Sequence, residues 1–126
     1  MSGDLSLEEF KAAVVGMILD RNPELAIKAL CEHYKVDVTR LAVGVLEGRT
    51  RGVQAVYSAS RKEILAANSE YLYDPFTIIR EFYHHLRYHG MRHRGTEKHA
   101  DKFAEGFIVA YTTVVARKIG ERQRAE

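Results

Sequence analysis

The chain has a single cysteine among its 126 residues, and its net charge of +2 at pH 7 favours neither sign. One cysteine excludes an intramolecular disulfide. Because Cys31 lies in an apolar helical pattern, we predict a small buried hydrophobe there and a reducing compartment. A charge so close to zero does not by itself indicate a polyanionic partner.

The N-terminus lacks the basic segment followed by an apolar core that marks a secretory signal, so none is expected. The apolar stretch 10–19 is interrupted by Lys11 and Gly16 and is too short to cross a bilayer. We therefore predict a cytoplasmic protein that does not bind membranes.

The composition is that of a globular domain, with 46% hydrophobic and 29% charged residues. A chain of this length can bury a core of its own without disulfides. We predict one domain over 1–126, with frayed ends at 1–5 and 120–126.

Two helices are predicted in the N-terminal quarter, at 7–20 and 23–33. Ser6 and Glu9 have the spacing of a capping box, and apolar residues follow at helical intervals. Asn22-Pro23 supplies a cap and a proline for the first position of the second helix. Both helices are expected to act as scaffold.

The middle of the chain predicts a small, mostly antiparallel sheet. Branched apolar residues in 36–45 indicate at least one strand, and alternation in 52–57 and a short apolar run in 63–67 indicate two more. We expect these to form an antiparallel meander. A helix-turn-helix over 25–46 is the alternative interpretation.

Two further helices are predicted after a loop at 68–73. Asp74-Pro75 is a strong helix start, and Gly90 is a natural stop. Thr96 caps the last helix, which has a long apolar face and is expected to end near Ile119. The predicted fold class is therefore α+β, with N-terminal helices, a small sheet, a motif helix and a long C-terminal helix.

The stretch 80–101 holds five of the six histidines and three carboxylates. On the predicted helix, Arg80, Glu81, His84 and Tyr88 share one side, opposite an apolar side made by Ile79, Phe82, Tyr83 and Leu86. A zinc hydrolase with an HExxH motif needs two histidines one turn apart, a glutamate base after the first, and a third ligand from elsewhere. Glu81 has the base position and His84 that of the second histidine.

Glu81-Phe82-Tyr83-His84, followed by Glu97 and Asp101 in an ExxxD pattern, resembles the gluzincin class of zinc metallopeptidases in its compact single-domain form. The order of elements over 36–111 agrees with this resemblance. It implies a zincin-like fold, a zinc cofactor and a polypeptide substrate hydrolysed by zinc-activated water. It also implies His84 and Glu97 as zinc ligands, Glu81 as the general base, and Asp101 as the residue that orients His84.

Arg80 departs from the motif, because it stands where the first histidine ligand belongs. Arginine is always charged and has no lone pair to offer a metal. His84 and Glu97 alone are too few for a catalytic zinc, which keeps three protein ligands. We therefore expect poor zinc binding and no peptidase activity.

Three resolutions stay open. In the first, the Arg80 guanidinium occupies the metal's place and pairs with Glu97 or Glu81. In the second, a neighbouring histidine completes a rearranged site: His85, His89 or, as the best candidate, His93. In the third, Arg80 is a change in an otherwise intact enzyme.

Other functions fit parts of this pattern. The basic set Arg87, Arg92, Arg94, Lys98 and Lys102, with Tyr88 beside it, predicts a nucleic-acid or other anion-binding surface. A peptidase-like fold that holds a polypeptide along an exposed strand edge without cutting it is a third hypothesis. The plain alternative is a solvated helix face, with Glu97 a first-turn acid and Asp101 a partner of Lys98 or Lys102.

Overall fold

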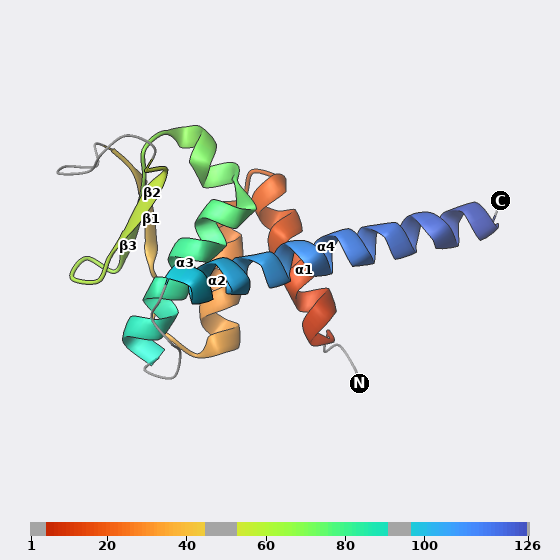
Figure 1. Ribbon diagram of the computed structural model, residues 1–126, viewed down its shortest axis with the longest axis horizontal. Coiled ribbons are helices and arrows are strands. Elements are labelled where there is room, and N and C mark those ends of the chain that lie inside the picture. The colour runs from red at the N-terminus through yellow and green to blue at the C-terminus, as the bar shows by residue number, and fades with distance from the viewer. Residues whose placement is uncertain (1–4, 45–52, 91–96, 126) are drawn as a thin grey trace.

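The computed structural model describes residues 5–44, 53–90 and 97–125. The elements in chain order are α1 (Leu7–Leu19), α2 (Pro23–Tyr34), β1 (Arg40–Val43), β2 (Ala55–Ser58), β3 (Glu63–Ala66), the 3-10 helix η1 (Ser69–Tyr73), α3 (Pro75–Gly90) and α4 (Glu97–Ala125). The predicted α+β class is confirmed. Figure 1 shows the sheet at one end of the molecule and α4 running across the helices, with its C-terminal part projecting beyond them.

The N-terminal helices begin and end close to the predicted residues. Ser6 and Glu9 form the capping box, with both side chains bonded to the opposite backbone N–H at 3.1 Å. Pro23 opens α2 as expected, but the Asn22 side chain makes no capping bond. α2 ends at Tyr34, and its C-cap Lys35, with a φ of 60°, turns the chain toward β1. Because β1 (Arg40–Val43) is a strand, the alternative of a helix-turn-helix over 25–46 is wrong.

The sheet is mixed, which corrects the predicted antiparallel meander. Its strand order is β1-β3-β2, with β2 antiparallel and β1 parallel to the central β3. Ile64 and Ala66 of the central strand β3 are fully buried. Local alternation predicts a strand but does not choose its neighbours, which is why the order was missed.

Two segments are more helical than predicted. The expected loop 68–73 contains η1, whose first turn is capped by the Asn68 side chain accepting from the N–H groups of Glu70 and Tyr71. Helix α4 passes Ile119 and continues to Ala125. Its last turns are rich in arginine, glutamate, glutamine and alanine, all good helix formers, and they outweigh Gly120.

The core lies between the helices and one face of the sheet. Helix α4 packs on α1 and α3, and the largest fully buried apolar side chains are those of Ile18, Ile27, Leu30, Ile64, Ile78, Ile79, Phe82, Leu86 and Phe107. Cys31 is buried among them, as predicted. In the described parts of the chain, no helix is both long and apolar enough to cross a membrane.

Candidate functional site

Helix α3 presents the motif residues to a cleft beside β2. At the start of the helix, the Thr77 hydroxyl lies 2.8 Å from Asp74 Oδ2. The same hydroxyl lies 2.8 Å from Gln54 Oε1, which connects the helix to the segment before β2. The predicted apolar face is confirmed, since Ile79, Phe82, Tyr83 and Leu86 are all buried. Burial of that face turns Arg80 and His84, both partly exposed, away from the core.

The Arg80 guanidinium binds three carboxylates. Nε donates to Asp101 Oδ1 at 2.5 Å, Nη2 to Glu97 Oε1 at 2.5 Å, and Nη1 to Glu81 Oε2 at 3.1 Å. The sequence predicted a pairing with Glu97 or Glu81; both occur, and Asp101 adds a third. We call Arg80, Glu81, Glu97 and Asp101 the guanidinium cluster.

His84 meets the same cluster. Its Nε2 lies 3.3 Å from Glu97 Oε1, the oxygen that also accepts from Arg80. The structure thus brings together the two residues that the resemblance implies as zinc ligands, although they come from different helices. The resemblance implies that Asp101 orients His84. In the structure, Asp101 instead accepts a hydrogen bond from Nε of Arg80.

Glu81 is the most buried member of the cluster. Its side chain is 7% exposed, and burial raises the pKa of its carboxyl to about 7. The Arg80 charge opposes this rise and the Glu97 charge adds to it, while hydrogen bonding from the Tyr57 backbone favours the ionised form. Glu81 therefore titrates near neutral pH, in the range suited to a general base.

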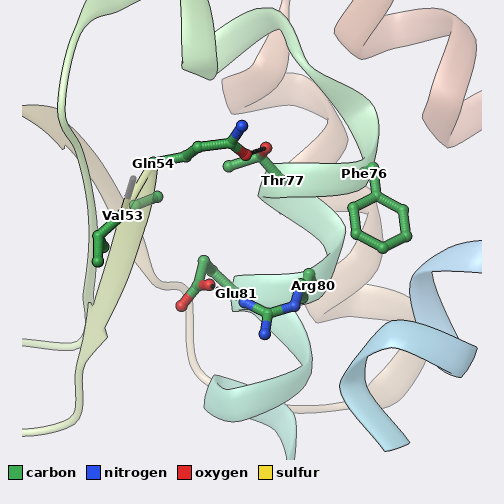
Figure 2. Close-up of a pocket in the computed structure, with 7 residues that line it drawn as sticks. Val53, Gln54, Phe76, Thr77, Arg80 and Glu81 are labelled. Atoms are coloured by element: carbon green, nitrogen blue, oxygen red, sulfur yellow. Dashed lines mark hydrogen bonds and ion pairs between the residues drawn. The ribbon is translucent and has the colours of Figure 1, made fainter. Parts of the chain in front are cut away.

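Two hollows flank Arg80 and Glu81 between α3 and β2. One, of about 350 Å³, is lined by Val53, Gln54, Ala55, Phe76, Thr77, Arg80 and Glu81. Figure 2 shows the Arg80 and Glu81 side chains side by side in it, with Phe76 beyond Arg80. The other, of about 410 Å³, shares Val53, Ala55, Arg80 and Glu81 and adds His84, Tyr88 and Glu97.

The outer edge of β2 forms one wall of this cleft. The Ala67 N–H donates to the Gln54 carbonyl across to β3, so in the antiparallel register Val56 also bonds to β3. The backbone groups of Ala55 and Tyr57 then face the outer edge. Among the described residues, no strand pairs with this edge.

The residues present do not fit a catalytic zinc. All three carboxylates of the cluster are engaged by Arg80, and Arg80 has no lone pair to offer a metal. Over 5–44, 53–90 and 97–125, no three His, Cys, Asp or Glu side chains are grouped so as to hold a metal ion. His84 contacts the cluster through Glu97.

His85 belongs to a buried network that the sequence did not predict. It is fully buried. Its Nε2 lies 2.6 Å from the Asp37 carbonyl, which only accepts, so Nε2 carries the hydrogen and Nδ1 accepts from the Tyr57 hydroxyl at 2.6 Å. Burial lowers the pKa of His85. Both nitrogens are occupied, which corrects its interpretation as a substitute ligand.

A signal for this burial exists in the sequence. His85 follows Phe82 by three residues and precedes Leu86, which places it on the apolar side of α3. His89 lies one turn on, with its ring centroid 4.7 Å from that of His85. Its Nε2 is buried and has no hydrogen-bond partner among the residues that the structure describes. His93, the preferred substitute ligand, lies outside the described residues.

The remaining candidates line or surround the cleft. Tyr88 is 59% exposed and lies at the rim of the second hollow, which Arg87 also lines. Lys98 and Lys102 are exposed on α4. Arg92 and Arg94, needed for the predicted basic surface, lie outside the described residues, so the nucleic-acid hypothesis stays a prediction.

Comparison with known proteins leaves the site to be judged on its own geometry. No family model, no curated protein and no solved structure matches the chain.

Proposed function

We propose that this protein is a zinc-metallopeptidase-like domain that holds an extended polypeptide without hydrolysing it, with Arg80 in the metal's place. One observation carries the proposal: the Arg80 guanidinium binds Glu81, Glu97 and Asp101 together. These are the three residues to which the gluzincin resemblance assigns the roles of base, ligand and orienter.

The charge balance of the cluster supports this function. Three carboxylates gathered in a partly dehydrated cleft need a cation, and a metal ion supplies it in a zinc enzyme. Here an arginine supplies it from within the chain. A guanidinium bridges carboxylates well through its planar fork of N–H groups, but it does not turn a water molecule into a nucleophile as zinc does.

The binding half of the proposal rests on β2. An extended peptide pairs with an exposed strand edge through main-chain hydrogen bonds, and hollows beside the edge receive its side chains. The outward N–H and carbonyl of Ala55, the outward carbonyl of Tyr57 and the two hollows around Arg80 and Glu81 offer this arrangement. The Tyr57 N–H is already directed to the Glu81 carboxyl.

Zinc content tests the role of Arg80. The unaltered protein and the Arg80→His variant are given the same excess of zinc, desalted and measured by elemental analysis. We expect little zinc in the unaltered protein and one zinc per chain in the variant, because a histidine at 80 completes a set with His84 and Glu97. The double variant Arg80→His/His84→Ala is the matched control and should lose the gained metal.

Two results contradict the proposal. Tight stoichiometric zinc in the unaltered protein means that other residues form the site, and absence of zinc from Arg80→His means that His84 and Glu97 do not converge as ligands. Peptidase assays on the same samples show whether the restored metal also restores hydrolysis.

A further inference from the structure

We infer that Arg80 also recognises the polypeptide, by donating hydrogen bonds to a main-chain carbonyl of an internal segment paired with the β2 edge. This inference rests on the proposed function and names the part of the partner that the site reads. Arg80 would then bind a peptide carbonyl through hydrogen bonds. In a zinc peptidase, the zinc ion would polarise such a carbonyl.

The donor count of Arg80 leaves hydrogen bonds to give. A guanidinium carries five N–H groups. The contacts with Asp101, Glu97 and Glu81 use one each on Nε, Nη2 and Nη1. Among the described residues, Nη1 and Nη2 have no further acceptor, so each keeps a second N–H there. The two groups are coplanar, which suits one carbonyl oxygen or a pair of adjacent acceptors.

The position of Arg80 directs these donors to the cleft. Arg80 lines both hollows, and Ala55 of β2 lines both with it. The Ala55 N–H and carbonyl face the outer edge of the sheet, where a paired segment would run. The main chain of a segment paired with Ala55 would pass beside Arg80. Because side chains alternate along an extended segment, those near Arg80 could enter the two hollows.

The charge of the cluster selects an amide carbonyl over a carboxylate. Arg80 offers one positive charge to the carboxylates of Glu97 and Asp101, so the cluster carries an excess of negative charge even when Glu81 is protonated. A chain terminus with a fourth carboxylate is repelled, whereas a neutral amide is not. The partner is therefore an internal, extended stretch of polypeptide.

Binding of a permanently unfolded chain tests the inference. The probe is ribonuclease A, reduced and alkylated with iodoacetamide so that it cannot refold, and labelled for fluorescence anisotropy. We expect the unaltered protein to bind it and Arg80→Lys to bind about tenfold more weakly, because lysine keeps the charge but loses the fork. Thermal unfolding of each variant checks the fold.

Two proline variants distinguish loss of hydrogen bonding at the β2 edge from a general effect of proline on the fold. Ala55→Pro removes an outward N–H on β2 and should abolish binding, since proline is tolerated on a strand edge but cannot donate. Val43→Pro is the matched control, because Arg40 and Gly44 donate to β3 and Val43 therefore faces the opposite edge of the sheet. It should bind as the unaltered protein does.

The outcomes distinguish the two proposals. Binding that is lost in Ala55→Pro but unchanged in Arg80→Lys overturns the role of Arg80 and leaves the peptide-binding function intact. Absence of binding by the unaltered protein overturns peptide binding itself, and the inference falls with it. If Arg80→Lys does not fold, nitrogen-15 NMR of the arginine side chains of the unaltered protein decides: Nη signals of Arg80 that do not move on saturation with the probe contradict the inference.

Discussion

Helix α3 carries two polar clusters about one turn apart, and they differ in nearly every physical respect. The guanidinium cluster is charged and opens to solvent, with the Glu97 and Asp101 side chains 67% and 46% exposed. The histidine network of Tyr57, His85 and the Asp37 carbonyl is fully buried at its centre and holds its bonds in a neutral form. The same helix thus keeps its charges at the cleft and its neutral hydrogen bonds inside.

This difference separates function from stability. Exposed charge pairs contribute little to folding because water screens them and their side chains lose entropy on pairing. Buried hydrogen-bonded groups are costly to disrupt because the partner left behind stays unsatisfied. We therefore expect the guanidinium cluster to govern what the protein binds and the histidine network to govern whether β2 and the segment before β1 stay attached to α3.

The largest effect on folding is expected from His85→Ala. This change leaves the Tyr57 hydroxyl and the Asp37 carbonyl without their partner and opens a cavity in the core. We expect the free energy of unfolding to fall by about 4 kcal/mol, measured by urea denaturation at pH 7.5.

The matched control is His33→Ala. His33 is exposed and stacks on Phe10 with a centroid distance of 4.0 Å, so its loss should cost about 1 kcal/mol or less. Equal losses for the two histidines would show that the buried network has no special weight, and the comparison of the clusters would fail.

Glu81→Gln should change how stability depends on pH. The pKa of Glu81 is raised from 4.5 to about 7 in the folded protein, so between these values the folded state holds a proton that the unfolded state releases. Stability from the protonated carboxyl is therefore present below pH 4.5 and lost as the pH rises through 7. Glutamine mimics the protonated form, and the variant should gain about 3 kcal/mol relative to the unaltered protein between pH 4.5 and 8.

Taking the difference between two proteins removes the titration of groups that do not interact with Glu81, including His85. Urea denaturation at four pH values from 4.5 to 8 measures that difference. Glu24→Gln, an exposed change on α2, is the control and should give no such trend. If the difference in the free energy of unfolding between Glu81→Gln and the unaltered protein does not change with pH, the Glu81 carboxyl behaves like the exposed members of the cluster and not like a buried group.

The elements with local signals were predictable from the sequence. The capping box at Ser6 and Glu9 and the proline after Asp74 specify helix starts through bonds within one turn, so they are visible in a few adjacent letters. The strand order was not visible, because pairing β1 with β3 depends on contacts more than twenty residues apart.

In the candidate site, too, the contacts that follow a sequence motif were predictable and those that depend on the tertiary arrangement were not. The convergence of His84 with Glu97 follows from a motif on two helices, and the structure places them together. The triple contact of Arg80 needed the crossing of α3 and α4, since the sequence predicted one carboxylate partner out of two and the structure supplies three. The burial of His85 was not predicted, because a stretch rich in histidines suggests metal ligands before core residues. The position of His85 beside Leu86 nevertheless indicated the core.

Asp101→Asn should have the smallest effect on stability, and it sharpens the comparison from the charged side. Its Oδ1 accepts from Arg80 Nε at 2.5 Å, but the side chain is 46% exposed, and an asparagine oxygen still accepts the bond. We expect a loss of at most about 1 kcal/mol in the free energy of unfolding. Glu8→Gln, which breaks the 2.9 Å ion pair with Arg117 far from the cleft, is the matched control with a similar exposure of 43%. A loss for Asp101→Asn well above that of Glu8→Gln, and near that of His85→Ala, would mean that the guanidinium cluster holds the fold together and is not free to serve a bound chain.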